Sequence, residues 1–144
     1  MKLIDITPDN HNTARKIKVK PEQDSFVANI EKTIVDAYVF KTSVFKLIED
    51  DGEIIGYTLL YPFDKDDLRY VNIVRFAIDA SYQGKGLGRM ALNHILDWIR
   101  NNFELDKFKI TVEPENSLAK ELYIKVGFIE GEMEGKELAL YMEV

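Results

Sequence analysis

Residues 78–89 read Ile-Asp-Ala-Ser-Tyr-Gln-Gly-Lys-Gly-Leu-Gly-Arg and lead from a strand-forming segment through three glycines into a helix-forming segment. Glycine has no Cβ atom, so the backbone of such a loop can approach an anion closely. The free N–H groups of the first helical turn point toward that anion, and the helix dipole favours its negative charge. The segment is therefore predicted to bind a phosphate group.

Two better-known phosphate-binding motifs do not fit this segment. A P-loop has Ser or Thr directly after its Gly-Lys pair, whereas Gly86 follows Lys85, and Asp79 stands where the first Gly of that motif belongs. A dinucleotide-binding fingerprint that starts at Gly84 would have its third glycine at position 89, which is Arg89. The pattern that remains is Gln-x-x-Gly-x-Gly over residues 83–88.

A second segment, residues 112–128, reads Val-Glu-Pro-Glu-Asn-Ser-Leu-Ala-Lys-Glu-Leu-Tyr-Ile-Lys-Val-Gly-Phe. In this order and spacing, the two segments resemble the acyl-CoA loop and the second half of the GNAT (GCN5-related N-acetyltransferase) superfamily. The resemblance implies an acetyl-CoA-dependent N-acetyltransferase that uses direct transfer in a ternary complex. It also implies a central mixed sheet of about seven strands with flanking helices.

Hydrophobic periodicity and turn residues predict one mixed α/β domain over residues 1–144, with the element order β-α-α-β-β-β-α-β-α-β-β. A helix is expected to start at the glycine loop and to bury Leu87, Ala91, Ile95, Trp98 and Ile99 on one stripe. The expected strands are 2–6, 44–49, 53–61, 70–79, 109–112, 128–130 and 138–144, and the other expected helices are 10–19, 21–38 and 117–126.

Composition narrows the class of protein. The chain has no cysteine and two isolated histidines, so we expect no disulfide, no metal site and no acyl-cysteine intermediate. Its net charge of −6 and the lack of a basic stripe argue against nucleic acid and suit a small cationic substrate. No signal peptide or membrane-spanning run is visible, which predicts a cytoplasmic protein without a membrane partner.

The resemblance assigns a cofactor site to the gap between strands 70–79 and 109–112, which run parallel and splay apart in this family. Phe76, Ala77 and Ile78 would offer backbone groups to the pantetheine arm. Solvated charges at a helix start are the alternative for Lys85 and Arg89, and a turn cap is the alternative for Gln83. The pyrophosphate would be held by the loop residues Gln83, Gly84, Lys85, Gly86, Leu87, Gly88 and Arg89.

Asn116 and Tyr123 each have two interpretations. Asn116 suits a helix N-cap, and the family places this position against the cofactor arm. Tyr123 has the spacing of a core residue, whereas the family places its hydroxyl beside the thioester sulfur. A phenol pKa of ~10 lies above a thiol pKa of ~8.5, so the expected role is a strong hydrogen bond to the leaving thiolate, with proton transfer late.

The acceptor amine must lose a proton before it attacks. A primary amine with a pKa near 10.4 is about 0.04% free base at pH 7, so a carboxylate is expected close to it. Glu113 is the first candidate for this base and acts directly or through water, and Glu115 is the second. A solvent-facing loop position is the alternative interpretation for both.

Within the superfamily, the nearest resemblance is to the bacterial spermine/spermidine acetyltransferases. It is carried by residues 20–23, 26–29, 82–86, 113–116, 131–132 and 135–137. It implies a polyamine acceptor with contacts to Glu22, Gln23, Asp24, Asn29 and Asp36, and surface solvation is the alternative interpretation for each of them. The alternatives are an acetyltransferase of protein or peptide N-termini and a non-catalytic acyl-CoA-binding module. The last hairpin offers a sheet edge for a homodimer.

Overall fold

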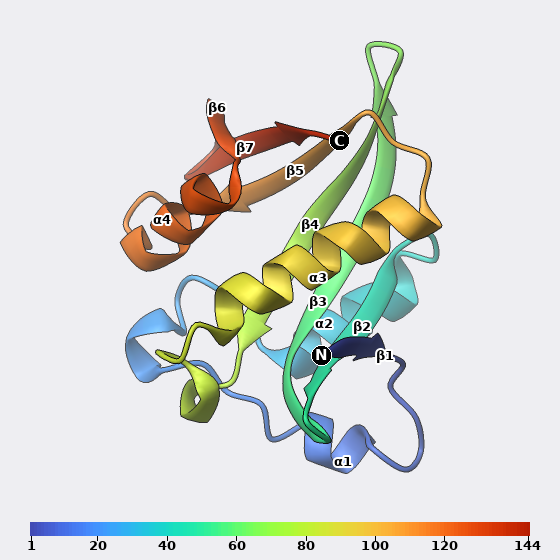
Figure 1. Ribbon diagram of the computed structural model, residues 1–144, viewed down its shortest axis with the longest axis vertical. Helices are drawn as coiled ribbons and strands as arrows, with labels where there is room; N and C mark the ends of the chain where they lie inside the picture. Colours follow the sequence, from blue (N-terminus) through green and yellow to red (C-terminus); the bar gives the residue numbers. More distant parts are fainter.

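The computed structural model describes all 144 residues, and its elements follow in the predicted order (Figure 1). The strands are β1 (Lys2–Ile4), β2 (Val44–Asp50), β3 (Glu53–Lys65), β4 (Leu68–Ile78), β5 (Lys107–Val112), β6 (Ile129–Glu134) and β7 (Glu137–Glu143). The helices are α1 (His11–Ala14), α2 (Ile30–Val39), α3 (Leu87–Asn102) and α4 (Ser117–Val126), with 3₁₀ turns at Pro21–Gln23 and Ala80–Tyr82. None of the helices is both long and apolar enough to cross a bilayer.

The seven strands form one mixed sheet in the order β1-β2-β3-β4-β5-β7-β6, which confirms the predicted fold class. All neighbours are antiparallel except β4 and β5, which are joined through α3 and run parallel. Two-residue turns close the long hairpins: Asp51 and Gly52 between β2 and β3, and Asp66 and Asp67 between β3 and β4. All four residues have positive φ, as type I′ turns require.

The sheet opens where β4 and β5 part. Their parallel pairing joins only Tyr70–Ile73 to Lys107–Ile110. Beyond it, β4 continues to Ile78 with β3 as its only partner, and the last two residues of β5 pair only with β7. The two wings of the sheet therefore diverge, as Figure 1 shows, and each presents an unpaired backbone edge to the opening.

A β-bulge lies at the start of this opening. Ile73 pairs with Leu60 and Arg75 pairs with Leu59, which leaves Val74 without a partner on β3. One extra residue inverts the alternation of side chains beyond it. Ile73 before the bulge and Phe76 beyond it consequently both pack toward the main core.

Two apolar cores lie on opposite faces of the sheet. The main core joins α3 to the sheet and includes Ala91, Leu92, Ile95, Leu96 and Ile99 of that helix, all buried. A smaller core on the other face joins α1 and α2 to the sheet. Its buried members are Ala14, Ile17, Ile30, Leu47, Tyr57 and Ala77. The predicted stripe of α3 is confirmed at three positions, while Leu87 and Trp98 are only partly buried.

The N-terminal helices are shorter than predicted. The continuous helix expected from Pro21 is wrong, because a 3₁₀ turn ends at Gln23 and α2 begins only at Ile30. Asn29 starts α2 by accepting a hydrogen bond from the Lys32 N–H at 2.8 Å. The helix expected over residues 10–19 is reduced to four residues in α1. By contrast, α4 has the predicted bounds of residues 117–126.

Candidate active site

The glycine loop joins the end of β4 to α3 and leaves the start of that helix open. Gly84 and Gly86 have φ values of 78° and 77°, so the left-handed backbone selects glycine at both positions. A Cβ atom at either position would have no protein atom within 4 Å, which leaves space beside the backbone. Gly86 occupies the N-cap of α3, and no side chain caps the helix there. The free N–H groups of the first turn are therefore available to an anion.

A reciprocal pair of glutamines fixes this loop. Gln83 donates from Nε2 to the Ile78 carbonyl oxygen at 2.8 Å and to Oε1 of Gln23 at 2.9 Å. Gln23 donates back from its own Nε2 to Oε1 of Gln83 at 3.0 Å, and its Oε1 also accepts from the Lys20 N–H at 3.1 Å. These bonds tie the loop to the end of β4 and to the 3₁₀ turn at Pro21–Gln23.

Two grooves meet in the opening of the sheet. The first, the loop groove, has a volume of about 320 Å³ and borders the glycine loop and α4. The second, the acceptor groove, has a volume of about 640 Å³ and lies between the segment 24–28, β4 and the β5/β7 wing. Both are lined by Val27, Phe76, Asn116 and Tyr123. A molecule bound in one groove would therefore come next to a molecule bound in the other groove at these four residues.

Most of the residues expected to bind the cofactor line the loop groove. They are Phe76, Ala77, Ile78, Gln83, Gly84, Gly88, Asn116 and Tyr123. Lys85, Gly86, Leu87 and Arg89 are not among the lining residues. Lys85 donates to the Ser81 carbonyl oxygen at 3.3 Å, whereas Arg89 is exposed and makes no ion pair within the chain.

Tyr123 combines the two roles considered from the sequence. Its ring belongs to the main core and lies 6.3 Å from the ring of Phe128, and the residue is only 6% exposed. Burial alone raises the pKa of the hydroxyl, and no hydrogen bond within the chain contributes to that shift. The phenol is consequently a neutral donor without a protein partner at the junction of the grooves.

Asn116 stands at the N-cap of α4, but its side chain makes no capping hydrogen bond. Only its backbone is engaged: the N–H donates to the Glu113 carbonyl oxygen at 2.8 Å, and its own carbonyl oxygen accepts from the Lys120 N–H at 3.1 Å. The side-chain amide therefore remains available to a molecule in either groove.

The two candidate bases differ in position. Glu113 lines the acceptor groove, with its side chain 18% exposed and one oxygen 3.5 Å from Nζ of Lys136. Glu115 is exposed and lines neither groove, so the geometry favours Glu113.

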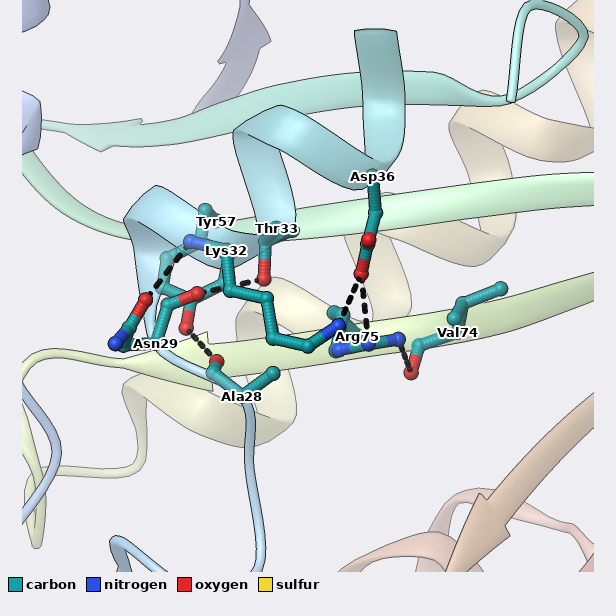
Figure 2. A network of polar contacts seen from close by, with 8 residues as sticks. All are labelled: Ala28, Asn29, Lys32, Thr33, Asp36, Tyr57, Val74 and Arg75. Carbon is teal, nitrogen blue, oxygen red and sulfur yellow. Dashed lines mark hydrogen bonds and ion pairs between the residues drawn. The ribbon is translucent and has the colours of Figure 1, made fainter. Parts of the chain in front are cut away.

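Charges in the acceptor groove are only partly compensated. Lys32 and Arg75 share a single carboxylate, that of Asp36, at 2.9 and 3.1 Å (Figure 2). Asp24 and Glu137 also line the groove and have no ion pair within the chain. The groove therefore has a mixed character, with a shared positive pair on the α2 side and two free carboxylates.

Of the five residues expected to contact the acceptor, Asp24 lines the acceptor groove, and the other four, Asp36 included, lie outside it. Gln23 lines the loop groove, Asn29 caps α2, and Glu22 is exposed and lines neither groove. Sequence reasoning missed Asn72 and Glu137, which do line the acceptor groove. For Asn72, the available signal was a polar residue between the apolar residues Val71 and Ile73 of a strand.

The comparisons with known proteins agree with this architecture. A family model described as "Acetyltransferase (GNAT) family" matches residues 7–128. The chain belongs to the GNAT family of acetyltransferases. Among curated relatives, it is similar to the spermine/spermidine N(1)-acetyltransferase of Bacillus subtilis, with 26% identity over 131 residues that cover 85% of this chain and 84% of the relative.

Solved structures share the same GNAT fold. The spermidine N-acetyltransferase from Vibrio cholerae, in complex with CoA and spermine, has a TM-score of 0.76 and 19% identity, covering 99% of this chain and 94% of the other. Arabidopsis thaliana Naa50, in complex with a bisubstrate analogue, has a TM-score of 0.69 and 20% identity, covering 99% of this chain and 98% of the other. At these identities, the likeness supports the fold and leaves the acceptor to be tested.

Proposed function

We propose that this GNAT protein transfers the acetyl group of acetyl-CoA to a primary amine of a polyamine such as spermidine or spermine, by direct attack in a ternary complex. The observation that carries the proposal is the meeting of the loop groove and the acceptor groove at Tyr123 and Asn116. Two bound molecules can exchange a group there without a covalent enzyme intermediate, and the chain has no cysteine to form one.

The loop groove fits an acyl-CoA. Uncapped N–H groups at the start of α3, together with the unpaired charge of Arg89, suit a pyrophosphate. The free edge of β4 from Arg75 to Ile78 offers backbone groups to an amide-containing arm. When bound, acetyl-CoA supplies an activated thioester carbonyl.

Each candidate catalytic residue has a defined task in this scheme. Glu113 accepts the proton that the amine must lose, directly or through water, and one of its oxygens lies 3.5 Å from Nζ of Lys136. Tyr123 donates a hydrogen bond to the sulfur as the C–S bond breaks and the new C–N bond forms. Because burial raises the pKa of Tyr123, full proton transfer from the phenol comes late, after charge has developed on sulfur.

A polyamine acceptor is supported by the charges of the acceptor groove and by the relatives. Asp24 and Glu137 are unpaired carboxylates on the path of an incoming cation. The two curated relatives that cover 85% of this chain are named for spermine or for spermine and spermidine, whereas a third, which covers 80% of it, is named a mycothiol acetyltransferase. One observation favours the second candidate, a peptide N-terminus: Lys32 and Arg75 share one carboxylate and retain positive charge for a peptide carboxylate.

A panel of acceptor amines with acetyl-CoA tests the proposal. We expect spermidine and spermine to have a kcat/KM well above those of monoamines and N-terminal peptides. The KM should rise with salt because attraction to the carboxylates is screened over ~8 Å at physiological ionic strength. A peptide that wins the panel, with a KM indifferent to salt, would refute the polyamine acceptor. Acetyl-CoA binding without turnover of any amine would favour the non-catalytic module.

A further inference from the structure

Few bonds hold the segment that forms one wall of the acceptor groove. Residues 24–28 line this groove, and none of them belongs to a helix or a strand. The N–H groups of Asp24 and Phe26 donate at 3.3 and 2.9 Å to carbonyl oxygens of the 3₁₀ turn that precedes the segment. No ion pair involves these five residues. Secondary structure therefore does not fix the position of this wall.

One hydrogen bond joins the segment to the sheet. The hydroxyl of Tyr57, on β3, donates to the carbonyl oxygen of Ala28 at 2.8 Å (Figure 2). It is the only hydrogen bond between residues 24–28 and any part of the chain beyond the preceding turn. Ala28 directly precedes Asn29, the N-cap of α2, so the bond holds the wall where it enters the helix.

Tyr57 is a rigid donor beside the opening of the sheet. Its side chain is buried in the smaller core, where its ring lies 6.1 Å from the ring of Phe45 in an edge-on arrangement. On β4 it pairs with Ala77, which belongs to the part of that strand that has β3 as its only partner. The hydroxyl therefore sets the position of the segment relative to the strand that borders both grooves.

The remaining anchor of the wall is apolar. Val27 packs against the smaller core and lines both grooves. Apolar packing has no preferred direction, whereas a hydrogen bond from a fixed donor defines both a distance and an angle. Asp24, one of the free carboxylates of the acceptor groove, lies four residues before the bonded Ala28. The placement of this carboxylate therefore depends on the bond from Tyr57.

We infer that Tyr57 is a positioning residue for the acceptor, because its hydroxyl holds residues 24–28 at the distance from β4 at which the acceptor groove binds an amine. The inference rests on the proposed polyamine function and deepens it. Tyr57 lines neither groove, so it acts only through the segment. The loop groove is lined by a single residue of that segment, Val27, so acetyl-CoA binding should depend little on the bond.

The test removes this one hydroxyl. Tyr57→Phe keeps the ring in the core and deletes the donor. Thr58→Val is the matched control, because Thr58 is also buried on β3 and its hydroxyl donates at the same 2.8 Å to a carbonyl oxygen outside the segment, that of Arg75. The kcat, the KM of spermidine, the affinity for acetyl-CoA and thermal unfolding are measured for each protein. Asp24→Asn is made in the wild type and in Tyr57→Phe, which completes a double-mutant cycle.

We expect Tyr57→Phe to raise the KM of spermidine about fivefold, the effect of one neutral hydrogen bond. Its kcat should stay within threefold of wild type and its affinity for acetyl-CoA within twofold. Thr58→Val should lower the unfolding temperature as much as Tyr57→Phe and leave the KM unchanged. Asp24→Asn should raise the KM in the wild type and raise it less in Tyr57→Phe, where the carboxylate is no longer held in place.

An unchanged KM of spermidine in Tyr57→Phe means that the apolar contacts of Val27 suffice, and it would overturn the inference. An equal rise in Thr58→Val would assign the effect to stability. An effect of Asp24→Asn that is equal in the wild type and in Tyr57→Phe would show that the hydroxyl does not act through the segment. If Tyr57→Phe does not fold, Ala28→Gly loosens the backbone at the bonded carbonyl without changing the core, and an unchanged KM in that variant has the same force. Wild-type protein that acetylates no polyamine would refute the proposed function itself, and the inference with it.

Discussion

Replacing Tyr123 by phenylalanine isolates the one hydroxyl that lies at the junction of the two grooves. The ring packs in the main core against Phe128, and phenylalanine keeps that packing. The hydroxyl has no hydrogen bond within the chain to lose, so folding stability should change little. The variant therefore separates a residue that only fills the core from one that acts on the leaving group.

The magnitude follows from the surroundings of the hydroxyl. Tyr123 lines both grooves, and phenylalanine at this position offers no donor to a developing thiolate. A hydrogen bond to a charged group contributes about 1.5–3 kcal/mol, and loss of a preorganised donor to a transition-state anion costs somewhat more. Taking about 2.7 kcal/mol, we expect kcat to fall about 100-fold with little change in acetyl-CoA affinity.

Released CoA can be followed with a thiol-reactive dye, because the chain contains no cysteine of its own to react. Single-turnover rates ensure that chemistry is the step observed. Tyr141→Phe is a matched control, since Tyr141 donates to Glu132 at 2.6 Å and lines neither groove. A single-turnover rate for Tyr123→Phe within threefold of wild type would refute the leaving-group role and leave Tyr123 a core residue.

Three further outcomes can be measured. Gly86→Asp should weaken acetyl-CoA binding at least tenfold, or about 1.4 kcal/mol, as measured by calorimetry. Gly135→Asp is the control, because Gly135 also has a positive φ, and it should leave the affinity unchanged. Equal affinities of the two variants for acetyl-CoA would show that the loop is not part of the site. Gln83→Ala and Gln23→Ala should each weaken acetyl-CoA binding, and the double variant should lose less than the sum of the two losses because the side chains form one pair; additive losses would contradict this. Burial raises the pKa of Tyr57 to about 12, so the unfolded chain loses this proton first and the stability of the fold should fall as the pH rises from ~10 to ~12. Denaturant unfolding from pH 9 to 12 checks this expectation, and Tyr57→Phe should flatten the curve.

Much of the fold could be predicted because the local sequence preferences for helix, strand and turn agree with the pattern of buried residues in the structure. Residues 117–126 combine a helical apolar stripe with a Gly at the C-cap, and α4 has these bounds. The prediction for the N-terminal stretch was wrong because apolar residues keep helical spacing from Pro21 to Tyr38. In the fold, Gln23 is hydrogen-bonded to Gln83, sixty residues away, and Asn29 caps a new helix. Hydrogen bonds between residues so far apart in the sequence cannot be predicted from the spacing of apolar residues.

The part of the candidate site that is formed by the backbone of the glycine loop could be predicted from the sequence. The glycine loop can be recognised from residues 83–88 alone, since left-handed turns and an uncapped helix start demand glycine. The acceptor side depends on the bulge at Val74, which has no marker in an apolar run and decides which side chains of β4 face the groove. Asn72 becomes informative only when the fold is known: its Oδ1 is buried without a hydrogen-bond partner, which is a property of the folded chain.

The divergence of β4 and β5 also links the stability of the protein to metabolism. A ligand that fills this opening binds the folded chain and not the unfolded one, so by mass action a concentration one hundred times its Kd adds about 2.7 kcal/mol to the free energy of unfolding. Proteases attack the unfolded population, which would shrink about a hundredfold under the same conditions. The half-life of this enzyme should therefore lengthen when acetyl-CoA is abundant and shorten when it is scarce.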